Sequence, residues 1–255
     1  MHEMKDVKVH FGRDFWGGSC ALIGITAVVF VAFAVWMLNC VVPDSSDMIA
    51  RYAPMADAFA QADWINAFHP RFCLQFPVLC GTLVWITGLP GDRACQMVAL
   101  LFFCFSAIPL WILARRLTGS FVAWSSVLIY WLCPDLILHA ADGWRDDCRV
   151  LSLLLVALGF LLSFTRTNPR PALGSVCLAV AQFLAITLRV DCFAIACLVL
   201  LTYCSFCVFR RQLMLVVAPI SAWAVATALE CQMVYYYTGW WLPAPHMIRF
   251  VEAFL

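Results

Sequence analysis

Polar and aromatic side chains of this chain gather in one long and three short stretches that separate apolar runs. The stretches cover residues 43–93, 139–149, 189–191 and 235–246. The first three combine acidic residues with arginine. Arginine's planar guanidinium holds a phosphate through two parallel hydrogen bonds, and a carboxylate accepts the proton of an attacking hydroxyl. This combination is suited to group transfer from a phosphate-bearing donor.

The candidate site residues lie in these first three stretches. They are Asp44, Asp47, Tyr52 and His69, then Asp142, Arg145 and Asp146, and finally Arg189. Asp44 and Asp47 are also ordinary helix-capping residues. Arg145 and Asp146 can equally form a surface ion pair that contributes little to stability. Arg189 is harder to explain structurally, since ionisable groups beside an apolar run are expensive and are usually functional.

The elements that must position these groups are membrane-spanning helices. The chain has 255 residues, of which 64% are hydrophobic and 12% charged, whereas soluble domains have about 25% charged residues. Its mean hydropathy is +0.90. The formal net charge is +1 without a basic stripe, which argues against nucleic acid as a partner. The sequence predicts an all-α, polytopic membrane helix bundle.

Seven apolar runs are long enough, or nearly long enough, to cross about 30 Å of hydrocarbon. They cover residues 20–42, 95–114, 121–138, 150–164, 172–188, 192–209 and 213–233. The first run follows a tail that contains Lys5, Lys8 and Arg13. We interpret this run as a retained signal anchor of a multi-pass protein of the cell membrane, with the N-terminus in the cytoplasm.

A further apolar stretch, residues 72–89, decides which side the later loops face. It contains Pro77, Gly81 and Gly88, which interrupt a helix. If the stretch does not span, nine of the sixteen Lys and Arg residues are cytoplasmic, against eight if it spans. In the arrangement in which the stretch does not span, twelve of the fifteen acids face outward. We therefore predict a re-entrant or interfacial helix over residues 72–89.

The first outer stretch also predicts a helix that lies on the membrane. Pro54 suits the first turn of that helix. Met55, Phe59 and Ala62 would share its apolar face, as an interfacial helix requires.

These predictions divide the chain into five parts. They are a cytoplasmic tail (1–19), the signal anchor (20–42), an outer loop with juxtamembrane or re-entrant helices (43–93), a six-helix transmembrane bundle (94–234) and an outer C-terminal segment (235–255). The tyrosine and tryptophan side chains of the last part favour anchoring at the membrane interface.

No cofactor is expected from the sequence. Most of the fourteen cysteines lie within apolar runs, where cysteine acts as a small hydrophobe. The pair Cys204 and Cys207 lacks the second pair or histidine that a zinc site needs. A divalent metal held by His69 and His139 remains open. Neither a GxxxxGK[ST] nor a GxGxxG motif is present, which favours a lipid-linked donor over a nucleotide sugar.

Several short motifs resemble those of GT-C type membrane glycosyltransferases. Those of the first outer loop are Asp47 followed by Arg51-Tyr52, the alanine-rich residues 55–64, His69-Pro70 and Pro77; later ones are residues 113–119, 143–146, 188–191 and 237–243. The closest resemblance is to family 39, which includes the dolichyl-phosphate-mannose protein mannosyltransferases and bacterial lipid A aminoarabinose transferases. It extends over residues 28–245.

The resemblance implies a set of residue roles. Asp47 matches the essential acid of the family's first outer loop, with Asp44 second. Asp146 matches the acid of the second loop, with Asp142 or Asp147 as alternatives. Members of the family usually continue with further spans, so the sequence also allows a truncated or inactive module.

The sequence therefore predicts an inverting glycosyltransferase on the extracytoplasmic face. Its donor is a polyprenyl-phosphate sugar, and its acceptor is a hydroxyl of a glycan, lipid or protein within or beside the membrane lipids. The alternative is a non-catalytic membrane protein, either a transporter component or an inactive glycosyltransferase module. Transporters place charged groups near the middle of the membrane, whereas nearly all charges of this chain fall at the ends of the predicted spans, with Glu230 inside the last span as the exception.

Overall fold

The computed structural model describes residues 13–43, 47–69, 72–165, 169–188 and 192–242. These residues form helices joined by short turns, and no strand occurs among them. Six helices are long and apolar enough to cross a membrane, and a bent helix pair makes a seventh crossing if it counts as one span. The predicted all-α polytopic bundle is confirmed.

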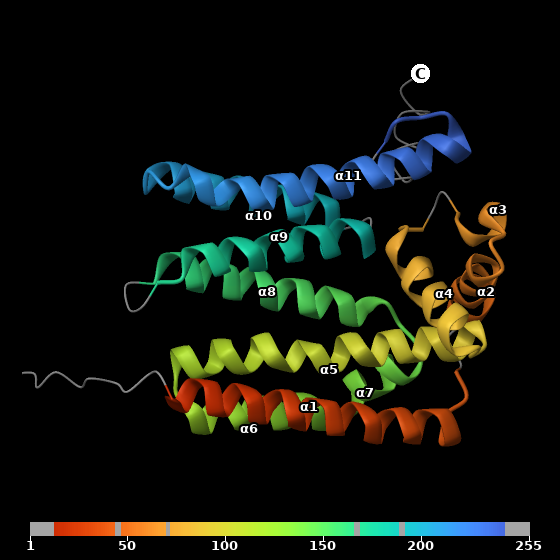
Figure 1. Cartoon of the computed structure of the whole chain (residues 1–255), viewed down its shortest axis with the longest axis horizontal. Helices are drawn as coiled ribbons and strands as arrows, with labels where there is room; N and C mark the ends of the chain where they lie inside the picture. The colour runs from red at the N-terminus through yellow and green to blue at the C-terminus, as the bar shows by residue number, and fades with distance from the viewer. Residues whose placement is uncertain (1–12, 44–46, 70–71, 166–168, 189–191, 243–255) are drawn as a thin grey trace, which may run out of the picture.

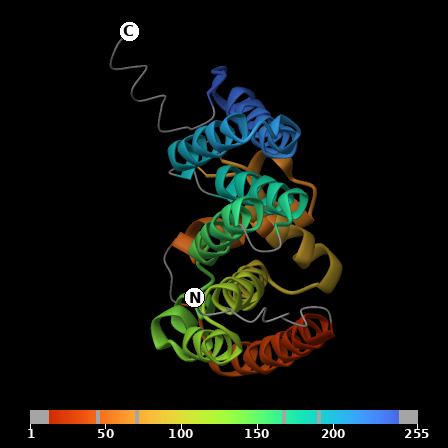
Figure 2. The ribbon, with the colours of Figure 1, turned by 90° about the vertical axis from the view of Figure 1, so that its left-hand side faces the viewer.

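The long helices match most of the predicted spans. They are α1 (Arg13–Cys40), α5 (Gly91–Leu117), α8 (Asp146–Phe164), α9 (Pro171–Leu188), α10 (Cys192–Phe209) and α11 (Val217–Thr238), the last preceded by the 3₁₀ turn η2 (Leu213–Val216). Figures 1 and 2 show these helices stacked from α1 at one side, through α5, α8 and α9, to α10 and α11 at the other.

The run 121–138 departs from the prediction, because it is two helices rather than one. Helix α6 (Ser120–Leu132) ends before Cys133, and α7 (Pro134–Ala141) continues at an angle of 53°. Pro134 has no backbone N–H, and it forces the residue before it out of the helical conformation. Cys133 accordingly has an extended backbone with a ψ of 112°.

Short helices cover one end of the bundle, at the right of Figure 1. They are the π-helical turn η1 (Met48–Tyr52), α2 (Ala53–Ala60), α3 (Trp64–Ala67) and α4 (Gln75–Thr87). We call residues 48–87 the cap. Helix α4 has 13 residues, or about 20 Å of length, which is less than the hydrocarbon thickness of about 30 Å.

The predicted apolar face of the helix at Pro54 is correct only in part. Met55 is buried, but α2 ends at Ala60, so Ala62 is not on the same face. Ala62 instead has a φ of +59° in the turn that follows. The turn is fixed by Asp63, whose carboxylate accepts hydrogen bonds from the backbone and side chain of Asn66 and so begins α3.

Two carboxylates fasten the cap by meeting the N-termini of other helices. Glu230 of α11 accepts the backbone N–H of Leu74, directly before α4, at 3.0 Å. Asp57 of α2 faces the N–H of Gly91, the first residue of α5; burial raises the pKa of Asp57, and that N–H opposes the rise. An acid at a helix N-terminus satisfies unpaired N–H groups and complements the helix dipole. A Cβ at Gly91 would collide with the carbonyl oxygen of Ala53, so glycine permits this close approach.

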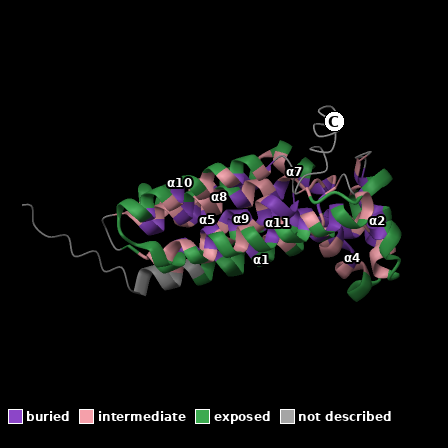
Figure 3. Ribbon diagram, turned by 90° about the horizontal axis from the view of Figure 1, so that it is seen from above, coloured by how far each residue is buried: buried purple, intermediate pink, exposed green. Residues whose placement is uncertain are grey.

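The interior and the surface of the bundle have the composition of a membrane protein. Buried residues lie on the parts of the helices that face one another, whereas exposed residues follow the outer faces (Figure 3). Large apolar residues such as Val28, Leu198 and Leu201 are more than half exposed. In water such a surface would be costly, so these faces are suited to lipid.

Candidate functional site

A pocket of about 150 Å³ lies where the start of the cap meets the turn between α7 and α8. Its lining residues are Asp47, Met48, Tyr52, Gly143, Trp144, Arg145 and Asp146. Typical small-molecule sites have volumes of about 300–1,000 Å³, so this pocket has room for the polar part of a larger ligand. It brings two polar stretches that are far apart in the sequence to one place.

The turn between α7 and α8 reaches the pocket because of Gly143. This residue has a φ of +73°, which a residue with a side chain adopts at a cost. A Cβ there would also lie 3.2 Å from the backbone nitrogen of Gln96. Glycine therefore lets the turn lie against α5, and the next residues, Trp144 to Asp146, enter the pocket wall.

Asp47 is oriented by a neighbouring arginine. Its carboxylate forms an ion pair with Arg51, with 3.0 Å between Oδ1 and Nη1. The two residues are four positions apart on one helical turn, and both side chains are about half exposed. Exposed pairs of this kind contribute at most about 1 kcal/mol, so the pair sets the direction of the carboxylate more than it stabilises the fold.

Aromatic rings support both arginines of this region. The guanidinium of Arg145 lies 5.2 Å from the ring centroid of Tyr52, and that of Arg51 lies 5.4 Å from the centroid of Phe72. Tyr52 and Phe72 meet edge to face at 5.3 Å, and Phe76 lies on another side of Tyr52. Cation–π contacts of this length hold a guanidinium while leaving its N–H groups in its plane available to a ligand.

Four of the predicted site residues share the pocket, namely Asp47, Tyr52, Arg145 and Asp146. Asp142 ends α7 and does not line the pocket. His69 is exposed, and its ring lies 5.2 Å from that of Phe72, outside the pocket lining. Asp44 and Arg189, predicted as second acid and second phosphate ligand, lie outside the described residues.

Asp147, the remaining alternative for the second-loop acid, is directed away from the pocket. It is 2% exposed, and its Oδ2 has no hydrogen-bond partner among the described residues. The neighbouring Asp146 instead lines the pocket. Successive residues of a helix point about 100° apart, so only one of two adjacent acids in the first turn of α8 can face the pocket.

Sequence reasoning missed the contributions of Met48, Trp144, Arg51 and Phe72. The spacing of Asp47 and Arg51 was a readable signal, because oppositely charged residues four apart meet on a helix. The packing of Phe72 against Tyr52 had no such signal, since it depends on how residues 72–87 fold back over η1.

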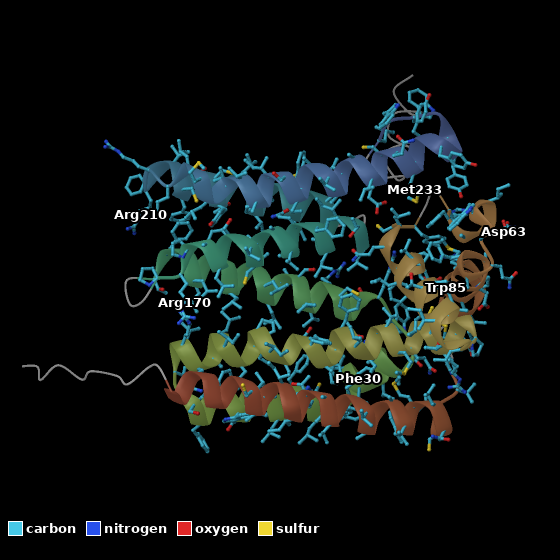
Figure 4. All side chains as sticks on the ribbon, in the orientation of Figure 1. Phe30, Asp63, Trp85, Arg170, Arg210 and Met233 are labelled. Carbon is cyan, nitrogen blue, oxygen red and sulfur yellow. The ribbon has the colours of Figure 1, made fainter. Side chains whose placement is uncertain are left out.

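An apolar pocket of about 330 Å³ lies between the cap and α11. Its lining residues include Trp64, Phe68, Leu74, Leu229, Met233 and Tyr236. Leu74 donates its backbone N–H to Glu230 directly before α4, and Met233 lies near the end of α11 that faces the cap (Figure 4).

No metal centre is evident within the described part of the chain, where no group of three or more His, Cys, Asp or Glu side chains is placed to hold an ion. The two histidines considered above lie beside aromatic rings, His69 beside Phe72 and His139 beside Trp144 at 6.0 Å.

Comparisons of the chain with models of known protein families, with curated proteins and with solved structures give no match. Residue chemistry and geometry therefore carry the functional argument.

Proposed function

We propose that this protein is a membrane glycosyltransferase that moves a sugar from a polyprenyl-phosphate donor to an acceptor hydroxyl, with inversion, on the extracytoplasmic face. One observation carries the proposal: Asp47, Arg145 and Asp146 line one pocket at the capped end of a membrane bundle. A proton acceptor and a phosphate partner are the two groups that such a transfer needs. The resemblance of the motifs to GT-C enzymes of family 39 points to the same reaction.

Each of the charged residues of the pocket has its own role in the reaction. The acceptor oxygen attacks the anomeric carbon while Asp47 takes its proton. The bond between that carbon and the phosphate oxygen breaks, and its electron pair leaves with the lipid phosphate. Arg145 stabilises the charge on this departing group, and Asp146 orients Arg145 or the sugar. Arg189 is proposed as a second phosphate partner.

The surroundings of the Asp47 pocket indicate where the lipid tail of the donor would bind and which acceptors could reach the site. The apolar pocket beside α11 is suited to part of the polyprenyl tail, because its lining is aromatic and aliphatic. A glycan, a lipid or a protein could supply the acceptor hydroxyl. The turn between α7 and α8 joins the pocket to the bundle, so the donor phosphate would lie near the ends of the spans.

The test is sugar transfer by the full chain in liposomes that contain a radiolabelled polyprenyl-phosphate sugar. We expect Asp47→Asn to lower the transfer rate by about 10²- to 10⁴-fold, the usual contribution of a general base. We expect Arg145→Gln to lower it strongly as well. The matched controls are Asp135→Asn, an exposed acid of α7, and Arg210→Gln at the opposite end of the bundle, which should leave the rate unchanged.

The results separate the proposal from its alternative. Full transfer by Asp47→Asn would remove this residue from the mechanism. Absence of transfer by the unmodified chain would favour a non-catalytic membrane protein. Two observations support that second candidate: Asp47 already has Arg51 as a partner, and the break between α6 and α7 is a feature that transporters share.

A further inference from the structure

A third pocket lies between helices of the bundle and shares no lining residue with the Asp47 pocket. It has a volume of about 370 Å³ and is lined by α8, α9 and α10. Its lining residues include Arg149, Ser152, Val156, Gln182, Ala185 and Ile195. Along α8 it extends from Arg149 to Val156, which is about 10 Å at 1.5 Å per residue. The cavity therefore runs into the membrane from the capped end.

The wall of this cavity is mainly apolar, with polar side chains at Arg149, Ser152 and Gln182. Arg149 lies in the first turn of α8, so its positive charge is near the end of the span. The hydroxyl of Ser152 donates to the carbonyl of Cys148 in its own helix at 2.9 Å. Arg149 therefore places one cation at the outer end of the cavity.

Gln182 of α9 adds a hydrogen-bond acceptor deeper in the membrane than the Arg149 side chain. The residue is 2% exposed and lines the cavity, and its Oε1 has no hydrogen-bond partner among the described residues. A buried acceptor without a donor costs about 1–3 kcal/mol. A bound molecule with a hydroxyl at this position would remove that cost.

The difference in depth between Arg149 and Gln182 sets the spacing between the polar groups of a molecule that could bind here. Arg149 is three residues from the start of α8, and Gln182 is six residues from the end of α9 at Leu188. Both of these helix ends are at the capped end of the bundle (Figure 1). At 1.5 Å per residue Gln182 lies about 4–5 Å deeper, a distance of three or four covalent bonds.

We infer that this cavity binds an anionic single-chain lipid that has a hydroxyl a few bonds from its phosphate. The phosphate interacts with Arg149, the hydroxyl donates to Oε1 of Gln182, and the alkyl chain occupies the apolar remainder. This cavity shares no lining residue with the Asp47 pocket, so the site is distinct from the donor site proposed above. The inference does not depend on glycosyl transfer.

Three probes that differ in one group each test the inference. They are lysophosphatidic acid with an oleoyl chain, its analogue without the glycerol hydroxyl, and monooleoylglycerol, which lacks the phosphate. Each competes with a fluorescent lysophosphatidic acid bound to the full chain in phosphatidylcholine nanodiscs. We expect the unmodified protein to prefer lysophosphatidic acid over the analogue by about fivefold, and over monooleoylglycerol by about tenfold or more. Equal affinities for all three probes would overturn the inference.

Two variants assign the preferences to residues. Gln182→Leu should bind lysophosphatidic acid only as well as its analogue, and it should fold normally because it replaces a buried acceptor without a donor by an apolar side chain. Arg149→Gln should weaken both phosphate-bearing probes and leave monooleoylglycerol unchanged. Arg210→Gln serves as the control for loss of a charge. If Gln182→Leu retained the full preference for the hydroxyl, the proposed orientation would be wrong.

Discussion

The two ends of the bundle differ in their charges and in how they are covered. At one end, Arg170 and Arg210 lie on short connections between helices (Figure 4), and α5 ends with Arg115 and Arg116 nearby. The last turn of α5 and the connections after α8 and α10 together contain six arginines and no acid. At the other end, acids and arginines are mixed beneath the cap. The first arrangement orients a protein in the membrane, whereas the second builds sites.

The charged side chains at the capped end also have a structural role, in which they differ from those at the arginine-rich end. Arg93 donates to the carbonyl of Val41 at 2.6 Å, just beyond the end of α1, and to Gln96 at 3.0 Å. Glu230 holds the start of α4. Arg115, at the other end, lies on the ring of Trp111 at 4.8 Å. Charged groups therefore tie helices together mainly where the cap must be positioned.

The largest expected effect is an all-or-none difference in labelling between the ends. Lysine occurs only at positions 5 and 8, so Lys5→Arg with Lys8→Arg gives a lysine-free background. In this background we expect Arg51→Lys to react with a membrane-impermeant amine reagent in intact cells. Arg210→Lys should react only after permeabilisation, and peptide mass spectrometry locates the label.

The same experiment decides whether α4 crosses the membrane. Both arginines are exposed, and lysine retains their charge. If α4 spanned the membrane, positions 51 and 210 would lie on the same side. Labelling of both positions in intact cells would therefore contradict the assignment of the two ends to opposite sides of the membrane. It would also contradict the proposed extracytoplasmic position of the site.

The next effect in size concerns the attachment of the cap. Glu230→Leu leaves the part-buried N–H of Leu74 without its acceptor, so we expect the free energy of unfolding to fall by about 1–3 kcal/mol. Glu230→Gln keeps a side-chain oxygen that can accept this N–H, and it should lose less. Thermal unfolding in detergent measures both variants. Equal stability of Glu230→Leu and the unmodified protein would mean that the cap is held by its apolar contacts alone.

The smallest effect is expected for the ion pair at the pocket entrance. Because Asp47 and Arg51 are half exposed, a double-mutant cycle with Asp47→Asn and Arg51→Gln should give a coupling energy below about 1 kcal/mol. The coupling should decrease further at high salt, since salt screens exposed charges. A coupling of several kcal/mol that is insensitive to salt would show that the pair is a structural element of the cap.

Several features of the chain were fixed by residue type and order. The spans followed from the length and hydropathy of the apolar runs, because each must match the thickness of the hydrocarbon. Pro134 within the run 121–138 was the signal of the break between α6 and α7, although the run was predicted as one helix. Asp63 and Asn66 likewise signalled that a new helix begins after Asp63, which means that α2 ends before Ala62.

Tertiary structure alone decided which polar groups meet. Asp47 and Arg145 line one pocket because the cap folds back over the bundle and Gly143 lets a turn approach α5. It also decided that Asp146 faces the pocket while Asp147 is buried, and that Glu230 meets the start of α4. Hydropathy acts within one helix, so the sequence determines what crosses the membrane. Hydrogen bonds and ion pairs act between helices, so their partners depend on packing.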